Sequence, residues 1–235
     1  MLLEVRDLEV AYGDYQVVWG VSLSVAAGES VALLGPNGSG KSTVVNTISG
    51  LLAAKAGDIR FEGASLKGRP THVRASLGIA HVLERRRVFP HLTVLQNLTL
   101  GAWHSAAKAA RATTLERVFT LFPRLSERKS QLARTLSGGE QQMLALGRGL
   151  MALPRLLMVD EPFLGLAPQV MEQMKSVFEA LKAEGIAILF IEQNVRLALS
   201  IAGRGYILES GRLAIEGHAA TLINSPEVRR IFLGG

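Results

Sequence analysis

The stretch 35–43 has the residue types and the spacing of a phosphate-binding loop. It reads Gly35, Pro36, Asn37, Gly38, Ser39, Gly40, Lys41, Ser42, Thr43 and matches the pattern G-x-x-x-x-G-K-[ST] in full. Its glycines allow backbone N–H groups to turn inward around a phosphate, and the Lys41 ammonium would reach the β- and γ-phosphates. The Ser42 hydroxyl would hold Mg²⁺. We therefore predict a nucleoside triphosphate site in this stretch.

The segments on both sides of the loop are those that such a site requires. The apolar run 30–34 predicts a buried strand, and the pattern from Ser42 to about Ser49 predicts a helix that ends at Gly50. The N-terminus of that helix would add a partial positive charge beneath the phosphates. A glycine-rich turn that merely happens to precede a helix is the alternative, and the complete match in a strand–loop–helix setting argues against it.

A pair of carboxylates follows a second apolar run. Residues 155–159 predict a strand, and Asp160 and Glu161 come directly after it. In open α/β sheets the ligand site lies at this end of the strands. Asp160 suits a ligand of Mg²⁺, directly or through water, and Glu161 suits a general base that orients water on the γ-phosphate. Taken alone, such a pair is only suggestive.

Two further features are candidates for nucleotide contact. Tyr12 lies in an early strand, and its ring could stack on a nucleotide base, although an ordinary strand aromatic is the simpler interpretation. The stretch Leu136, Ser137, Gly138, Gly139, Glu140 interrupts a helical region, and Ser137 at a helix start would make a second anion-binding N-terminus. A plain loop between helices is the alternative for the two glycines.

The remaining patterns predict an α/β protein. Short alternating segments over residues 2–34 predict an antiparallel β layer, and the stretch from about 92 to 151 predicts an inserted helical lobe. The other predicted elements are a strand pair at 57–63, a strand at 77–83, a helix at 168–183, a strand at 185–191 and a hairpin at 206–215 that turns at Ser210 and Gly211.

Composition narrows the class of protein. No run approaches the roughly 18 uncharged apolar residues that span a bilayer, and the N-terminus lacks the layout of a signal peptide, so we expect an intracellular soluble protein. The absence of cysteine excludes disulfides and thiolate metal sites. The net charge of +6 is spread along the chain except for residues 85–87, which favours a solvated surface over a nucleic-acid or lipid contact.

The order of the phosphate loop, the stretch Leu136–Glu140 and the pair Asp160–Glu161 resembles that of the ATP-binding cassette ATPases over essentially the whole chain. The resemblance implies one domain over 1–235: a P-loop NTPase (RecA-like) core at about 1–91 and 152–235, with the N-terminal β layer, and a helical signature subdomain at about 92–151. It also implies a head-to-tail dimer in which Leu136, Ser137, Gly138, Gly139 and Glu140 of one subunit act in trans on ATP held by the other.

Finer marks resemble the ATPase subunits of branched-chain amino acid importers, namely the stretches 86–90, 136–143, 165–168 and 192–194. Carried over by position, Glu84 stands for the usual Q-loop glutamine, Ala167 for the D-loop aspartate and Gln193 for the switch histidine. Glu84 would accept a hydrogen bond from Mg²⁺-bound water, and the Gln193 amide would donate to a γ-phosphate oxygen. Leu83, Arg85 and Phe163 depart from the subfamily pattern, and a left-handed backbone at Arg85 would cost about 1 kcal/mol.

The resemblance thus implies an ATP-hydrolysing subunit that uses ATP and Mg²⁺ and docks on membrane permeases at the cytoplasmic face. We expect it to power import of branched-chain or related amino acids, paired with a different cassette subunit or with a second copy, and served by a solute-binding protein. Urea, amides or another solute are the alternatives, followed by a nucleic-acid-associated cassette ATPase, although we expect no nucleic-acid partner. A GTPase or kinase of another class is opposed by Leu136–Glu140 and by the absence of an Asn-Lys-x-Asp segment. Residues Glu84–Arg87 are expected near the permease contact, with a solvated basic loop as the alternative.

Overall fold

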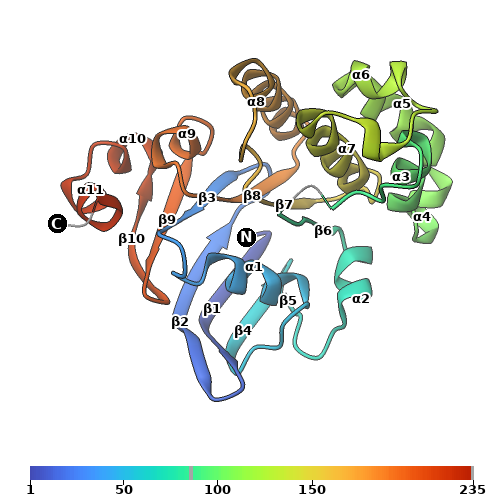
Figure 1. Cartoon of the computed structure of the whole chain (residues 1–235). Coiled ribbons are helices and arrows are strands. Elements are labelled where there is room, and N and C mark those ends of the chain that lie inside the picture. Colours follow the sequence, from blue (N-terminus) through green and yellow to red (C-terminus); the bar gives the residue numbers. More distant parts are fainter. Residues whose placement is uncertain (85–86, 234–235) are drawn as a thin grey trace.

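The main sheet has six strands, and the computed structural model describes residues 1–84 and 87–233 of the chain. In spatial order the strands are β10 (Arg212–His218), β9 (Arg204–Glu209), β3 (Ser30–Leu34), β8 (Ala187–Glu192), β7 (Leu156–Asp160) and β6 (Ile79–Val82). All neighbours are parallel except β10, which pairs antiparallel with β9. The carboxyl ends of β3, β7 and β8 therefore meet at one edge of the sheet (Figure 1).

A second, antiparallel sheet covers one face of the first. Its strands lie in the order β2 (Tyr15–Val25), β1 (Leu3–Tyr12), β4 (Ala56–Phe61), β5 (Ala64–Ser65). The predicted layer at the start of the chain is therefore present. A strand pair also lies near the predicted range 57–63, because β4 pairs antiparallel with β5, but β4 pairs with β1 as well, which was not predicted. β4 pairs along β1, with Leu3 opposite Phe61, because Ile59 and Phe61 share the core of the β1 side chains. Only the short β5 continues beyond it.

Successive residues of the central strands face two different cores. Val31 and Leu33 of β3 point to the core shared with the antiparallel sheet and α1 (Lys41–Ser49), whereas Ala32 and Leu34 point to the core shared with the other helices. This alternation follows from the two-residue period of a strand. Because both faces are covered, the strand is apolar almost throughout, as expected for parallel sheets.

The helices lie mainly on the second face of the main sheet and at one end of it (Figure 1). Between Leu92 and Met151 they are α3 (Val94–Gly101), α4 (Ser105–Ala109), α5 (Arg111–Leu121), α6 (Pro123–Glu127), the 3₁₀ turn Ala133–Thr135 and α7 (Gly138–Leu150). The helix α8 (Pro168–Ala183) has the predicted bounds. The short helices α2 (Thr71–Ser76), α9 (Val195–Leu199), α10 (Ala219–Leu222) and α11 (Pro226–Leu233) were not predicted, because so few turns give little periodicity to detect.

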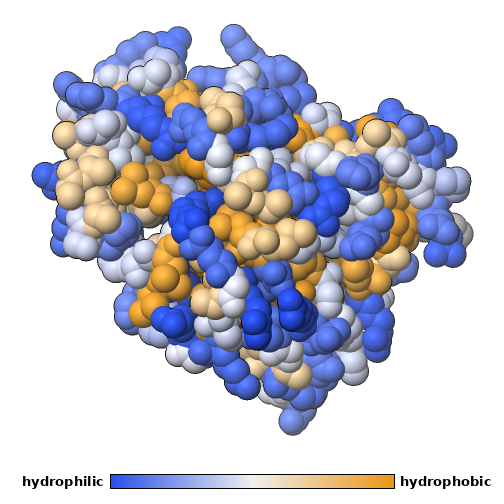
Figure 2. Space-filling model, turned by 180° about the vertical axis from the view of Figure 1, so that it is seen from behind, coloured by the Kyte–Doolittle hydropathy of each residue, from blue (hydrophilic) through white to orange (hydrophobic). Residues whose placement is uncertain are grey.

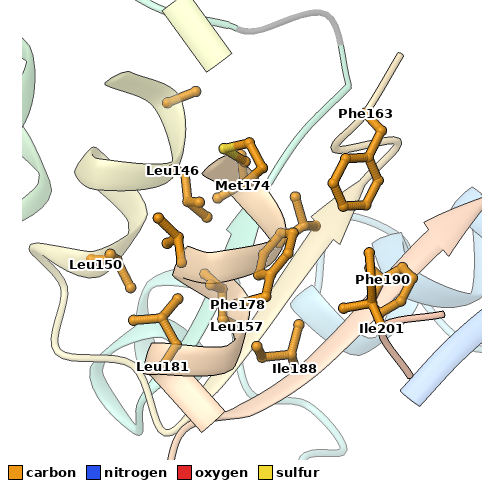
Figure 3. Packing of buried hydrophobic residues seen from close by; sticks show 14 of the residues in the cluster. Leu146, Leu150, Leu157, Phe163, Met174, Phe178, Leu181, Ile188, Phe190 and Ile201 are labelled. Carbon is orange, nitrogen blue, oxygen red and sulfur yellow. The ribbon is translucent and has the colours of Figure 1, made fainter. Parts of the chain in front are cut away.

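Buried side chains join α7 and α8 to the main sheet. Leu146 and Leu150 of α7 lie in the same hydrophobic cluster as Leu157 of β7 and Phe190 of β8 (Figure 3). The cluster also contains residues of α3 and α5, so the helices between 92 and 151 and the sheet share one continuous core. The division of the chain into a core and an inserted lobe stays a prediction.

The surface mixes apolar and polar residues. Figure 2 shows hydrophobic areas on one face that are separated by strongly hydrophilic ones. Within residues 1–84 and 87–233, none of the helices combines the length and the apolar composition needed to cross a membrane.

Candidate functional site

The loop between β3 and α1 has the backbone that its glycines predict. Gly40 precedes α1 with a φ of 98°, and Gly38 has a φ of 79°, both in the region that side chains with a Cβ atom rarely adopt. Gly35 is needed for space, because a Cβ atom there would lie 2.3 Å from the Leu208 carbonyl oxygen. The predicted helix and strand flank the loop, with α1 starting one residue earlier than expected.

Lys41 is the first residue of α1, and its side chain folds back toward the backbone of the loop. It is 6% exposed, and its Nζ donates to the carbonyl oxygens of Gly35 at 2.8 Å and Pro36 at 2.9 Å. Burial lowers its pKa, while the carboxylates of Glu161 and other nearby residues oppose that change. The Ser39 hydroxyl is buried nearby and has no hydrogen-bond partner within the described part of the chain. The loop thus holds a cation and an unused hydroxyl, which suits a phosphate oxygen.

Asp160 and Ser42 face each other across the loop and the end of β7. A side-chain hydrogen bond joins them, and Asp160 is 6% exposed. Burial raises the pKa of Asp160 to about 6, with the charges of Glu161 and Glu84 adding to the rise. Adjacent carboxylates that repel one another are relieved by a divalent cation, and a hydroxyl and a carboxylate are the oxygen ligands that Mg²⁺ prefers. This donor set therefore fits Mg²⁺ together with phosphate oxygens.

Glu161 and Gln193 come from the loops after neighbouring strands, β7 and β8. The Gln193 Nε2 atom donates to Glu161 Oε1, so the two predicted catalytic side chains are in contact. Glu161 has a φ of 48°, in the left-handed region, and its backbone N–H donates to the Ile191 carbonyl at 3.0 Å. Since β7 and β8 are parallel neighbours, the residues that follow them meet at the same sheet edge.

Lys41, Ser42, Glu161 and Gln193 line one pocket of about 410 Å³, whereas Asp160 is not in its described lining. Its lining contains the predicted residues Asn37, Gly38, Gly40, Lys41, Ser42, Thr43, Glu84, Glu161 and Gln193, and two that were not predicted, Val17 and Leu164. Tyr12 lies beside the loop, with its hydroxyl 3.4 Å from Thr43 Oγ1 and its side chain 49% exposed. A ring in that position is available to a base bound over the loop.

The stretch Leu136–Glu140 starts α7 at a different place. Ser137 is the N-cap, and its hydroxyl accepts from the Glu140 N–H at 3.3 Å while Glu140 Oε2 accepts from the Ser137 N–H at 2.8 Å. This reciprocal capping box leaves the N-terminus of α7 at the surface. None of these residues is among the described lining of the phosphate pocket, so within one chain the structure does not bring the two together.

The three departures from the subfamily pattern have different outcomes. Arg85 lies outside the described residues, as does Arg86, and the left-handed backbone at Arg85 stays a prediction. Leu83 lines a groove described below. Phe163 is 4% exposed, and its ring packs edge-on against Phe178 at 5.8 Å between centroids. A large apolar ring thus anchors the loop that carries Glu161.

Three residues at the site were not predicted, because little in the neighbouring sequence indicates a role for them. Val17 and Leu164 look like ordinary apolar positions, and nothing near them in sequence points to a phosphate. Glu192 is the buried last residue of β8 and contacts the loop after β7. Its signal in the sequence is a charged residue directly after the apolar run 186–191, and Asp160 gives the same signal after the apolar run 155–159.

Comparisons with known proteins agree with this geometry. The protein-family model described as ABC transporter matches residues 18–164. The chain is 44% identical over 234 residues, covering 100% of both chains, to the high-affinity branched-chain amino acid transport ATP-binding protein BraG of Pseudomonas aeruginosa. It is 32% identical to the lipopolysaccharide export system ATP-binding protein LptB of Escherichia coli, covering 99% of this chain and 97% of the relative. A solved structure of a nucleotide-free ATP-binding cassette from an ABC transporter matches with a TM-score of 0.89 and 27% identity, covering 100% of this chain and 99% of that one.

Proposed function

The chain belongs to the ABC transporter family and is an ATP-hydrolysing subunit of a transporter of that family. We propose that it hydrolyses ATP in the phosphate pocket, with Glu161 as the general base and Gln193 as its partner. The observation that carries this proposal is the contact between the two side chains beside Lys41 and Ser42 in one pocket. Glu161 accepts a proton from the attacking water or orients it, and the Gln193 amide donates to the phosphate. Lys41 stabilises charge on the β- and γ-phosphates.

The metal belongs to the same proposal. Ser42 and Asp160 would hold Mg²⁺ together with phosphate oxygens, and Glu84 would accept a hydrogen bond from a water on the metal. When bound, Mg²⁺ supplies positive charge to the phosphate oxygens and offsets the repulsion among the carboxylates. The raised pKa of Asp160, which follows from burial and from the charges of Glu161 and Glu84, supports a site that is built for a cation.

Closure of a dimer completes the site. Ser137 is exposed at the start of α7, and none of the residues Leu136–Glu140 is in the described lining of the phosphate pocket of its own chain. A second subunit in head-to-tail orientation would supply this stretch in trans, so that ATP joins the two subunits. The partner is a different cassette subunit, as the marks shared with branched-chain amino acid importers indicate, and a second copy of this chain is the alternative.

A groove about 500 Å³ in volume is the proposed contact with the permease. Leu51, Phe89, Leu100 and Trp103 are exposed by 50%, 50%, 48% and 41%, and all four line it. Exposed aromatic and aliphatic side chains around a hollow are typical of a docking site for an amphipathic helix. We assign it to a cytoplasmic helix of the permease with an apolar face, at the cytoplasmic side of the membrane.

The groove and the phosphate pocket are adjacent along the chain. Leu83 lines the groove and Glu84 lines the phosphate pocket, so movement of the segment after β6 reaches both. On the groove side, the Arg148 guanidinium lies 5.0 Å from the centre of the Phe89 ring and thereby links α7 to this segment. Docking of the permease would then be coupled to the nucleotide through residues 83–84.

The groove is tested by the substitution Trp103→Ala, with Trp19→Ala as a matched control. Both side chains are 41% exposed, but Trp19 lies on β2 and is not part of the described groove lining. Trp103→Ala should lower solute transport in the assembled transporter at least severalfold and leave basal ATPase within about twofold, while Trp19→Ala changes neither. Equal loss of transport and of basal ATPase in Trp103→Ala would contradict the assignment.

The transported solute is proposed to be a branched-chain or related amino acid. The support is the 44% identity to BraG over the full length of both chains. The 32% identity to LptB, which belongs to a lipopolysaccharide export system, makes another transported molecule the alternative. Urea and short amides are further alternatives. Uptake of labelled leucine, valine and urea by vesicles that contain this chain, its permeases and a solute-binding protein separates these cases. ATP-dependent uptake of urea alone would replace the amino-acid proposal.

A further inference from the structure

Glu192 joins the two loops that carry the proposed catalytic side chains. It is the last residue of β8 and is 5% exposed. Its Oε1 accepts from the Phe163 backbone N–H at 3.2 Å, and its Oε2 accepts from the Gln193 backbone N–H at 3.3 Å. One buried carboxyl group therefore holds the loop after β7 and the loop after β8 by their backbones.

The loop after β7 is held in a conformation that it would not adopt freely. Glu161 has a φ of 48°, and a left-handed backbone costs a residue with a Cβ atom of order 1 kcal/mol. Two residues further on, the Phe163 ring packs on Phe178, which stacks on Phe190 with centroids 6.2 Å apart (Figure 3). The ring fixes this loop from the hydrophobic core, while Glu192 fixes it from the sheet edge.

Burial makes the ionisation of Glu192 depend on pH near neutrality. Burial raises its pKa to about 7, the Glu161 charge adds to the rise, and the backbone N–H donors oppose it. Among the described residues, Lys41 is a cation whose charge interacts with that of Glu192. A protonated carboxyl donates through its hydroxyl, so it can no longer accept from both N–H groups through two free oxygens. The two-loop contact is therefore complete only when Glu192 is ionised.

We propose that Glu192 is a positioning residue for ATP hydrolysis, whose carboxylate holds the backbones of Phe163 and Gln193 so that the side chains of Glu161 and Gln193 meet at the phosphate pocket. This inference rests on the proposed roles of Glu161 and Gln193. It deepens them, because neither side chain would keep its position if the two loops moved apart. Glu192 touches backbone rather than substrate, so its effect on the reaction is indirect.

The test compares Glu192→Gln and Glu192→Asp with the control Glu172→Gln in the assembled transporter. Glu172 lies on α8 with a side chain that is 72% exposed, so its substitution removes a carboxylate without touching the site. In Glu192→Gln, the amide oxygen can accept from one of the two backbone N–H groups. The amide NH₂ group is a donor, so the other backbone N–H loses its acceptor. We expect kcat to fall about tenfold, as the loss of one charged hydrogen bond implies, with KM for ATP within about twofold.

The pH profile is a second measurement. In the wild type, kcat should fall below pH 7 as Glu192 becomes protonated, and this fall should be shallower in Glu192→Gln. Glu192→Asp should lie between Glu192→Gln and the wild type, because it keeps the charge but is one methylene shorter.

Three results overturn the inference. The first is a Glu192→Gln variant with the kcat and pH profile of the wild type. The second is a fall of the unfolding temperature with unchanged kcat, which makes Glu192 merely structural. The third applies if Glu192→Gln does not fold. In that case, a Glu192→Asp variant with the kcat of the wild type refutes the positioning role. Glu161→Gln is measured in parallel: if it still turns over ATP, the proposed chemistry fails, whereas an inactive Glu161→Gln beside a normal Glu192→Gln refutes the positioning role alone.

Discussion

Replacing Glu161 with glutamine is the sharpest test of the chemistry. Glutamine has nearly the same shape, and its amide oxygen can still accept from Gln193 Nε2, so the contact between the two loops is kept. The change removes the carboxylate that would take a proton from the attacking water or orient it. Lys41, Ser42 and Asp160 remain to hold the phosphates and the metal.

The usual contribution of a general base sets the size of the expected effect. A general base contributes about 10²–10⁴-fold to the rate, so hydrolysis should fall by that factor. Binding should not fall, because Glu161 lines the pocket proposed for ATP and its charge adds to the raised pKa of Asp160. Removing a negative charge there lowers repulsion toward ATP. The variant should therefore accumulate an ATP-bound dimer with its cassette partner.

Single-turnover hydrolysis and size-exclusion chromatography, with ATP, Mg²⁺ and the partner present, measure both effects. Glu179→Gln serves as the control, since Glu179 lies on α8 with a side chain that is 58% exposed. If Glu161 only stabilised the loop after β7, hydrolysis would fall no further than stability does. Turnover by Glu161→Gln within about tenfold of the wild type, below the 10²–10⁴ range, would remove Glu161 from the mechanism.

Three further predictions concern the loop, the assembly and pH. Lys41→Ala should abolish ATP turnover and weaken binding of a fluorescent ATP analogue, because it removes the buried cation at the phosphates, and near-normal hydrolysis would refute the phosphate-loop assignment. The chain purified alone should elute as a monomer or weak dimer with low ATPase activity, and robust transport with this chain as the sole ATPase would contradict the heterodimer. Finally, the pKa of Glu192 is raised from 4.5 to about 7, so the folded state binds a proton more tightly than the unfolded state. The stability that this proton contributes is complete below pH 4.5 and is lost as the pH rises through 7. The free energy of unfolding falls over that range by up to about 3 kcal/mol. The unfolding temperature of Glu192→Gln relative to the wild type should therefore increase between pH 4.5 and 8, and a constant difference would argue against a raised pKa.

The sequence by itself determined the parts of the site that depend on residues close together in the chain. The phosphate loop, its flanking strand and helix, and the carboxylates after β7 were predicted within one or two residues, since glycine conformation and side-chain periodicity are local properties. The helix start at Ser137 was predicted for the same reason, because a capping serine acts within the first turn of its helix.

Only the tertiary structure decided which distant residues meet. The parallel pairing of β7 and β8 brings Gln193 against Glu161 and places Glu192 beneath both loops, and no local pattern contains the order of strands in a sheet. The pairing of β4 with β1 was missed for that reason. The role of Phe163 was also invisible in the sequence, because its ring is explained by Phe178 and Phe190, which lie on other elements. Side-chain periodicity tells which face of an element is buried, but the partner against which it is buried is set by the packing of the whole chain.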